Sequence, residues 1–494
     1  MKRLNFFCVS LCLVYVIFIG CLPESSKAER LAHTYCSSCH IFPEPSLLDK
    51  ATWSQVLPQM AFRMGAGHFE MVERVPPGDM KTVMATIPSV AMVTPAQWSM
   101  IEDYYLTAAP DSLIITDRPV IKEMTGFDVS LNASFAAPYV TLIKTDPETK
   151  NIYVGTRLSY LYKLNQQLVI TDSLKLTSTP SDIIFEKDQT WLTLMGWMDP
   201  NDQPIGSIVH ADTKMATFHT LLDTLRRPVQ LAKADLNGDG SDEFVVCAFG
   251  NFLGSLSLYD FSKTLPEQKI LSLKPGSRKV VIKDFNKDGL PDILALMTQG
   301  DERLALFTNK GGLQFEEQNL LQFPSVYGSN YFELADFNGD GFEDILYVNG
   351  DNGDYSVIFK PYHGIRIFEN DGTFHFKEKY NFFMAGASEA MARDFDGDGD
   401  LDIAAIAFFP DFKKHPEQSF IYLENKGGYD FEAQVTPEAV KGRWLVMEST
   451  DFDLDGDTDI LVGAANFKGM GFNGGQPWRE GEGSLLVFRN RLKH

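Results

Sequence analysis

The chain has 494 residues, which is ample length for more than one domain. Its formal net charge is −22 at pH 7. An acidic balance of this size argues against nucleic-acid binding and favours basic protein partners, whose association would weaken as salt is added.

The N-terminus carries two basic residues and then an apolar run from Leu4 to Gly20, a pattern typical of a secretory signal peptide. The run is short for a membrane span. It ends in Phe18-Ile19-Gly20-Cys21, which resembles a bacterial lipobox. The resemblance implies a signal peptide over residues 1–20, lipidation of Cys21 and a tether over 21–27. The rest of the chain is then expected in the bacterial cell envelope, anchored to the membrane through lipid on the periplasmic or cell-surface side. An uncleaved signal anchor is the alternative.

The segment Cys36-Ser37-Ser38-Cys39-His40 predicts covalent haem c. Two thiols three positions apart can add across the haem vinyl groups, and the histidine that follows can ligate the iron. A thioredoxin-like dithiol would need a preceding βαβ pattern, and a zinc site would need another Cys or Cys/His pair. Neither is visible, because the only later cysteine is Cys247. That residue is expected to lie buried in a strand, so no disulfide framework is predicted.

Helical patterns cover residues 27–35, 51–64 and 96–106, around the cysteine motif. Three helices around such a loop resemble a small class I cytochrome c domain, here over residues 28–111. The run 57–65 resembles the segment after this motif in cytochromes fused to FG-GAP repeats, which implies Met60 as the sixth iron ligand, with Met64 in reserve. A standard class I cytochrome places this methionine shortly before the last helix, where Met92 lies. A vacant sixth position is the remaining alternative.

Beyond residue 112, short β-rich runs alternate with turns, and one nine-residue acidic phrase occurs five times at intervals of 49–58 residues. Repeats of this length indicate propeller blades. Oxygen-bearing side chains at positions 1, 3, 5 and 9, with glycine at position 6, favour calcium. An EF-hand is excluded because position 12 never carries glutamate. Solvated acidic turns without a cation are the alternative. The candidate ligands are Asp235, Asn237, Asp239, Glu243; Asp284, Asn286, Asp288, Asp292; Asp336, Asn338, Asp340, Asp344; Asp394, Asp396, Asp398, Asp402; and Asp451, Asp453, Asp455, Asp459.

These phrases resemble the FG-GAP/VCBS repeats of integrin-type β-propellers, and the resemblance covers residues 112–494. It implies up to five structural calcium ions. Strands that run into Asn-containing glycine turns follow several loops, as at 304–312, 365–372 and 420–428. Residues 145–155 and 181–196 look like two degenerate blades, which would give seven blades, with six as the alternative. The strand 484–488 is expected to close the ring by pairing with the segment 113–121.

The predicted fold is therefore a small all-α cytochrome c domain followed by an all-β propeller. The predicted function is one-electron transfer to a redox partner protein of basic charge, with the propeller as docking or structural module. Two alternatives stay open. One is a propeller enzyme that passes electrons to its own haem, although no catalytic cluster stands out in the sequence. The other is a surface adhesion or glycan-binding propeller with a vestigial cytochrome.

Overall fold

The computed structural model describes residues 26–67, 75, 78–116, 118–132, 135, 139–212, 215, 217–263, 266–353, 356–466 and 483–492. The expected signal peptide and Cys21 lie outside these residues. Among the residues described, no helix has the length and apolar character needed to cross a membrane.

The N-terminal residues form a helical part whose main helices begin where side chains cap them. Its elements are α1 (Lys27–Cys36), the 3₁₀ turn η1 (Pro45–Leu47), α2 (Lys50–Arg63), α3 (Met80–Met84) and α4 (Pro95–Ala108). Ser26, Asp49 and Thr94 each accept a hydrogen bond from the backbone N–H three residues on, at 3.1, 2.7 and 3.3 Å. Helices α1, α2 and α4 match the three predicted helices to within two residues.

The core of the helical part is aromatic and is bonded to the loop that follows the cysteine motif. Trp53 and Tyr105 are buried, with ring centroids 4.5 Å apart. Trp53 Nε1 donates to the carbonyl of Pro45, and the Tyr105 hydroxyl donates to the carbonyl of Pro43, both at 2.8 Å. Helices α2 and α4 therefore hold the loop 41–48 in place.

The remaining residues form a propeller of seven four-stranded antiparallel sheets, which confirms the seven-blade prediction. Blades are numbered in chain order, and the two expected degenerate blades are blades 1 and 2. Blade 1 is β2 (Val140–Thr145), β3 (Ile152–Thr156), β4 (Tyr160–Leu164) and β5 (Ile170–Lys175); blade 2 is β6 (Pro180–Phe185), β7 (Gln189–Leu194), β8 (Gly206–Asp212) and β9 (Phe218–Leu225); blade 3 is β10 (Pro228–Ala234), β11 (Glu243–Ala248), β12 (Ser255–Asp260) and β13 (Glu267–Ser272); blade 4 is β14 (Ser277–Lys283), β15 (Asp292–Met297), β16 (Arg303–Asn309) and β17 (Phe315–Gln322).

Blades 5 to 7 complete the ring. Blade 5 is β18 (Ser329–Ala335), β19 (Asp344–Asn349), β20 (Gly364–Asn370) and β21 (Phe376–Phe383); blade 6 is β22 (Ala387–Arg393), β23 (Asp402–Ala407), β24 (Phe420–Asn425) and β25 (Phe431–Gln434), with the 3₁₀ turns η3 (Pro416–Ser419) and η4 (Pro437–Lys441) beside it; blade 7 is β26 (Trp444–Thr450), β27 (Asp459–Ala464), β28 (Leu485–Asn490) and β1 (Phe127–Asn132).

Blade 7 closes the ring by combining strands from the two ends of the propeller sequence. β1 pairs antiparallel with β28, in a register that runs from Phe127 opposite Asn490 to Asn132 opposite Leu485. The expectation that the last strand closes the ring is confirmed, but the expected partner, 113–121, is wrong. Residues 127–132 alternate apolar and polar side chains, as a half-buried strand requires, whereas 113–121 contains Pro119, which cannot donate to a ladder.

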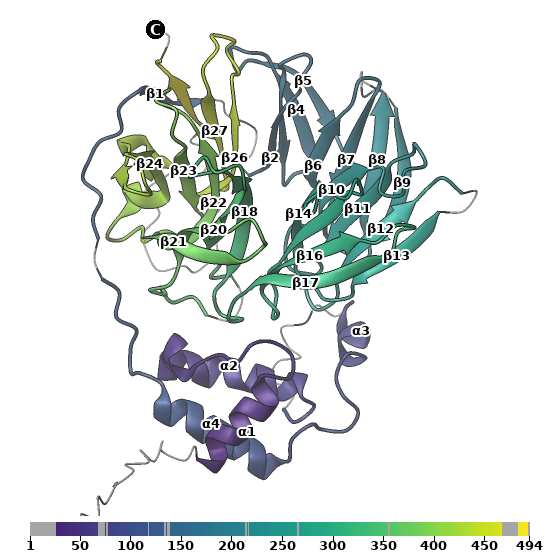
Figure 1. Cartoon of the computed structure of the whole chain (residues 1–494), viewed down its shortest axis with the longest axis vertical. Helices are drawn as coiled ribbons and strands as arrows, with labels where there is room; N and C mark the ends of the chain where they lie inside the picture. The colour runs from purple at the N-terminus through teal and green to yellow at the C-terminus, as the bar shows by residue number, and fades with distance from the viewer. Residues whose placement is uncertain are drawn as a thin grey trace, which may run out of the picture.

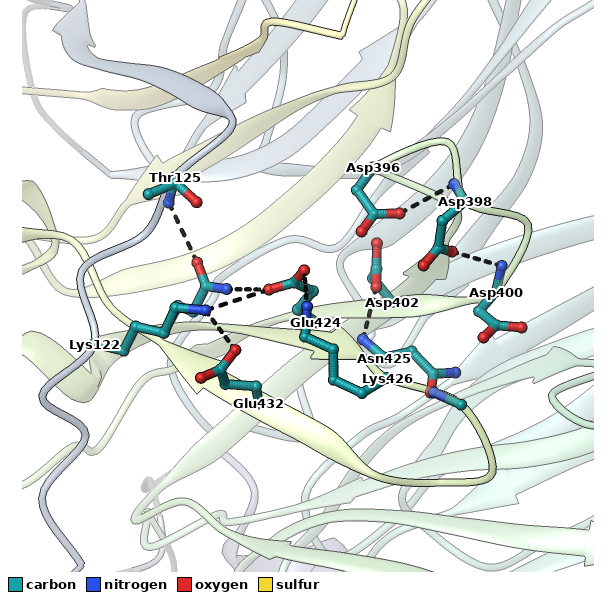
Figure 2. Close-up of polar contacts among 12 residues, drawn as sticks. Lys122, Thr125, Asp396, Asp398, Asp400, Asp402, Glu424, Asn425, Lys426 and Glu432 are labelled. Carbon is teal, nitrogen blue, oxygen red and sulfur yellow. Dashed lines mark hydrogen bonds and ion pairs between the residues drawn. The ribbon is translucent and has the colours of Figure 1, made fainter.

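The segment before β1 lies along blade 6 as a fixed linker. Lys122 forms ion pairs with Glu424, at 3.6 Å, and with Glu432, and the N–H of Thr125 donates to Gln434 at 3.2 Å (Figure 2). Figure 1 shows the linker rising from the helical part along the outside of the propeller. The linker that connects the helical part to the propeller thus also leads directly into β1, the strand that closes the ring.

The first strands of neighbouring blades contact one another around the centre of the ring. A side chain from each first strand forms a hydrogen bond with the first strand of the next blade. Each link is a hydrogen bond to a backbone N–H or carbonyl, with donor–acceptor distances of 2.6–3.4 Å. Four of the seven links use a carboxylate, which makes them charge-assisted. The links are Thr141–Pro180, Asp182–Leu231, Gln230–Val280, Arg278–Asn330, Glu333–Ala392, Glu389–Met447 and Glu448–Thr145.

The helical part packs against one end of the propeller (Figure 1). The Tyr362 hydroxyl donates to the carbonyl of Leu47 at 3.0 Å, and Asp79 accepts from the N–H of Asp202 at 2.9 Å. Arg63 lies over the ring of Phe252, 4.4 Å from its centroid. The propeller residues in these contacts lie in loops between second and third strands. The acidic phrases join first to second strands, so they lie at the opposite end of the blades.

His363, beside Tyr362 at this interface, is fully buried, and within the described part of the chain neither of its ring nitrogens has a hydrogen-bond partner. Burial lowers the pKa of His363 well below its usual value, and the charges of Lys360 and Arg366 add to the shift. The folded protein therefore holds this imidazole neutral.

We expect the His363→Leu variant to lose less stability on acidification than the wild type. Below about pH 6.5 the unfolded chain binds a proton at His363 that the folded chain does not, so folding weakens by up to about 1.4 kcal/mol per pH unit. Unfolding temperatures between pH 7.5 and 5.5 measure this. His219→Gln, at an exposed position in β9, is the control. Parallel pH profiles for all three proteins would contradict the buried neutral state.

Candidate functional site

The cysteine motif lies at the end of α1, where the chain turns. Cys36 is the last residue of the helix and is partly buried, whereas Cys39 is exposed, and both are free thiols. The Ser38 hydroxyl donates to the carbonyl of Tyr35 at 2.6 Å and holds the turn between the two cysteines. The site thus offers two thiols on one ordered turn.

His40 has the orientation expected of a metal-ligating histidine. Its Nδ1 lies 2.8 Å from the carbonyl of Ile41. A carbonyl can only accept, so this contact places the proton on Nδ1 and leaves the lone pair on Nε2. Such a bond from the second nitrogen is the usual support of a ligating imidazole. Burial is the largest cause that lowers the pKa of His40, so the ring is neutral at physiological pH.

The environment of Cys36 favours covalent attachment over dithiol redox chemistry. Burial raises the pKa of the Cys36 thiol to about 11, against the opposing effect of a hydrogen bond with Tyr105. Dithiol oxidoreductases need a lowered thiol pKa instead. Cys36 also packs against the apolar core of the helical part, which includes Met64, and Phe42 nearby stacks on His33 with centroids 3.8 Å apart. An apolar, aromatic wall of this kind suits a flat hydrophobic cofactor.

The three candidate methionine ligands have different positions. Met64, at the end of α2, is 6% exposed and belongs to the same hydrophobic cluster as Cys36. Met92 is 41% exposed, and its N–H donates to the carbonyl of Met64 at 2.9 Å. Met60 lies one turn earlier on α2, partly buried and outside that cluster as far as the described residues define it. Its place in the cluster against which Cys36 packs therefore favours Met64, while Met60 stays a prediction.

The five acidic phrases form loops between the first and second strands of blades 3 to 7. In each loop the carboxylate at position 1 accepts a hydrogen bond from the N–H of the glycine at position 6, with N···O distances of 2.8–3.2 Å. That glycine has φ between 87° and 98° in all five loops, in the left-handed region that disfavours other residues. The sharp turn expected from the sequence is present in every copy.

Position 9 is fully buried in all five loops and links the loop to the strands. One oxygen of its carboxylate accepts from the N–H at position 2, at 2.8–3.3 Å. In blades 4 to 7 the other oxygen accepts from the N–H of the asparagine that ends the third strand, at 2.8–2.9 Å. Burial is the main cause that raises the pKa of Asp402 to about 6 and that of Asp459 to about 7.

The five loops differ in the side chain at position 3, and this difference separates them as metal sites. In blades 3 to 5 it is asparagine, whose amide nitrogen donates to a carboxylate of its own loop at 2.9 Å. In blades 6 and 7 the side chain at position 3 is aspartate, whose carboxylate has no hydrogen-bond donor. Burial and neighbouring carboxylates raise the pKa of both Asp396 and Asp453.

Within the described residues, carboxylate oxygens converge to within 4.8 Å in these last two loops, in the groups Asp394, Asp396, Asp398 and Asp451, Asp453, Asp459. Figure 2 shows the side chains of Asp396 and Asp398 pointing toward Asp402, which comes from the start of β23. A hard divalent cation such as Ca²⁺ fits this set of oxygen donors. The loops of blades 6 and 7 are therefore the stronger candidates among the five predicted ones.

Four buried asparagines that were not predicted join the loops to the blades: Asn309, Asn370, Asn425 and Asn490. The side-chain nitrogen of each donates to the carbonyl at position 8 of its own loop, at 3.1–3.2 Å. Asn309 and Asn490 also donate to the position-2 carbonyl of the preceding blade's loop, at 2.7 and 2.6 Å. For Asn309, Asn370 and Asn425 the sequence shows an Asn just before a glycine turn, which indicated only the turn; Asn490 has no such signal. Cys247, by contrast, is buried in β11 as predicted.

Three segments of the chain match the FG-GAP-like repeat family: residues 235–295, 284–347 and 394–462. The first two overlap, and the third is separate. Together they contain all five acidic loops. The propeller carries FG-GAP-like repeats. A stretch of 145 residues is 28% identical to integrin alpha-4 of Xenopus laevis, and this match covers 26% of the present chain and 14% of the integrin.

Among solved structures, the FG-GAP propeller is similar to the β-propeller domain of Cps50 (Swd1) from Myceliophteria thermophila, with a TM-score of 0.45, 10% identity, and coverage of 73% of this chain and 99% of that one. It is also similar to the Pan2 WD40 domain of Neurospora crassa, with a TM-score of 0.45, 9% identity, and coverage of 76% and 99%.

We expect Asn490→Ala to destabilise the FG-GAP propeller by about 2–4 kcal/mol, because it leaves the buried carbonyl of Phe395 and the partly buried carbonyl of Thr458 without this donor. The unfolding temperature measures the loss. Asn319→Ala, at an exposed position on the outermost strand β17, is the matched control and should change stability by less than about 0.5 kcal/mol. Equal losses in the two variants would rule out a linking role for Asn490.

Proposed function

We propose that the protein is a c-type cytochrome of the bacterial cell envelope, anchored through a lipid on Cys21, which transfers single electrons while its FG-GAP propeller serves as a docking or structural module. The observation that carries the proposal is the arrangement of Cys36, Cys39 and His40. Two free thiols flank an ordered turn, and a neutral imidazole follows with its Nε2 available.

Each residue of the motif has a defined part in this proposal. Cys36 and Cys39 would hold haem through two thioethers, and His40 Nε2 would ligate the iron, oriented by the Ile41 carbonyl. Haem bound there supplies a one-electron couple. The sixth ligand would be Met60 on the family resemblance, or Met64 on its place in the hydrophobic cluster against which Cys36 packs.

The propeller holds this motif in a fixed position. The Tyr362 hydroxyl donates a hydrogen bond to the carbonyl of Leu47, and the N–H of Asp202 donates one to Asp79. These two bonds join the helical part to the propeller at separate points. The net charge of −22 favours a basic redox partner, which long-range attraction would steer toward the protein at low salt. The acidic loops lie at the end of the blades opposite the helices, so a partner that exchanges electrons with the motif would dock nearer the helical end.

Calcium is part of the proposal as a structural ion. The side chains at positions 1, 3, 5 and 9 of the loops would hold it, first in blades 6 and 7, where the carboxylates converge. Burial and, after it, neighbouring carboxylates raise the pKa of Asp396 and Asp453; a cation there would offset that repulsion and would stabilise the folded blades by mass action.

A second candidate function is an adhesion-type binding propeller, and the similarity to integrin alpha-4 is the observation that favours it. It requires no haem. The cytochrome proposal requires a haem that is covalently attached and reducible, so one spectrum separates the two.

We expect the full-length protein, produced with cytochrome c maturation machinery, to give a reduced-minus-oxidised c-type spectrum that survives acid–acetone extraction. The double substitution Cys36→Ala and Cys39→Ala should abolish the retained band, because both thioethers are lost. Cys247→Ala, which removes a thiol buried in the propeller, should retain it. Wild-type protein without retained haem would refute the cytochrome and leave the binding propeller.

We expect chelation with EGTA to lower the unfolding temperature of the propeller, and calcium to restore it. Bound calcium at 100 times its dissociation constant would contribute about 2.7 kcal/mol per site. Asp396→Ala, which removes the position-3 oxygen, should remove one site in calorimetric titration, whereas Asp400→Ala, which removes a carboxylate of the same loop at position 7, should not. Unchanged stability in EGTA, or equal effects of the two substitutions, would count against a calcium site.

A further inference from the structure

A cavity of about 310 Å³ lies where the helical part, the linker and the propeller meet. The start of α2 and the linker form one wall, and segments at the helical end of blades 5 to 7 form the other. Most of the described lining is apolar, including Leu113 and Ile115 of the linker, Phe359 of the β19–β20 loop and Phe412 of the β23–β24 loop. Cavities of about 300–1,000 Å³ with mainly apolar walls are typical of small-molecule sites.

The linker turns alternate side chains toward this cavity. Leu113 and Ile115 line it and are partly buried, whereas Ile114 between them is 85% exposed. The linker also starts from a fixed point, because the N–H of Lys50 in α2 donates to the carbonyl of Pro110 at 3.0 Å. The apolar wall on this side is therefore an ordered part of the fold.

Arg443, directly before β26, brings a positive charge to the lining. It is 3% exposed, its N–H donates to Asn466 Oδ1 at 2.8 Å, and its carbonyl accepts from Ala465 at 2.7 Å. Its guanidinium carbon lies 5.1 Å from the ring centroid of Phe408 and 5.3 Å from that of Phe412. Burial lowers the pKa of Arg443 to about 10, so the group is charged at neutral pH. Aromatic faces stabilise a cation without neutralising its charge, so the guanidinium can still attract an anion.

Two further polar residues of the lining determine its charge balance. Asn352 is buried, and its Oδ1 accepts from Nζ of the buried Lys360 at 2.6 Å, which places a second cation behind the wall. Asp49 brings a carboxylate, but this carboxylate caps α2 by accepting from the N–H of Thr52 at 2.7 Å, where the positive end of the helix offsets its charge. The described lining therefore favours an anion, although the whole chain has a net charge of −22.

We propose that this cavity is a binding site for a small organic anion, a carboxylate with an apolar body. The carboxylate meets the guanidinium of Arg443, whose paired N–H donors match its two oxygens, and the apolar body lies among Leu113, Phe359 and Phe412. A ligand there contacts the helical part, the linker and the propeller together, so its binding stabilises their association. The site does not depend on haem, because the cysteine motif is not among the described lining residues.

Isothermal titration calorimetry of the full-length protein at pH 7 tests this site with 4-phenylbutyrate as the probe. The amide 4-phenylbutanamide has the same shape without the charge, and 4-phenylbutylamine carries the opposite charge. We expect one molecule of the acid to bind per chain and the amine not to bind. The amide should bind about tenfold more weakly than the acid, because neutral hydrogen bonds replace charge-assisted ones. Arg443→Gln should lower the affinity for the acid to that for the amide.

Two tryptophan substitutions in the linker locate the site. Leu113→Trp should abolish binding, because the larger side chain fills the cavity. Ile114→Trp adds the same side chain at the adjacent exposed position and should bind the acid as the wild type does. Thermal unfolding gives a second measurement, in which the acid should raise the Tm of the wild type and of Ile114→Trp but not that of Leu113→Trp.

Three results would each overturn the proposal: no binding of 4-phenylbutyrate at millimolar concentration, equal or tighter binding of the amide or the amine, or binding that persists in Leu113→Trp. If Arg443→Gln does not fold, the three probes on the wild type and the two tryptophan variants still decide the question. Loss of the cytochrome proposal through a protein without haem would leave these outcomes unchanged.

Discussion

The pairing of β1 with β28 is the constraint on which the rest of the structure depends. It joins Phe127 to Asn490 and so closes a ring that would otherwise expose two sheet edges. The hydrogen bonds between first strands, from Thr141–Pro180 around to Glu448–Thr145, require that closed ring, because the last of them joins blade 7 to blade 1. Closure also fixes the start of β1, and with it the linker that Lys122 ties to blade 6.

Closure and strand alternation together divide the molecule into two functional ends. The helices meet the end that carries the loops between second and third strands, through Tyr362 and Phe252. The acidic loops occupy the other end, because they join first strands to second strands. A cation in those loops acts on the blades and not on the cysteine motif.

Features encoded within a few residues could be predicted from the sequence. The capping residues Ser26 and Thr94 define helix starts, and each loop turn follows from a glycine at a fixed position. Features that depend on distant partners could not. The closing strand was misplaced because the alternation in residues 127–132 indicates a strand but not its partner, and β28 lies at the far end of the sequence. The role of Asn490 was not predicted, because its bond to the Phe395 carbonyl crosses between blades.

The unequal loops connect the proposed cation sites to ring closure. In blade 7 the buried carboxylate of Asp459 accepts from the N–H of Asn490, the residue of β28 that pairs with Phe127. The same carboxylate converges with Asp451 and Asp453. Burial and that crowding raise the pKa of Asp459 to about 7. The carboxylate that accepts the hydrogen bond from the closing strand is thus the same one that neighbouring aspartates crowd. A cation that relieves the crowding would therefore stabilise the junction where the ring closes, and blades 3 to 5, whose asparagines already supply a donor, need it less.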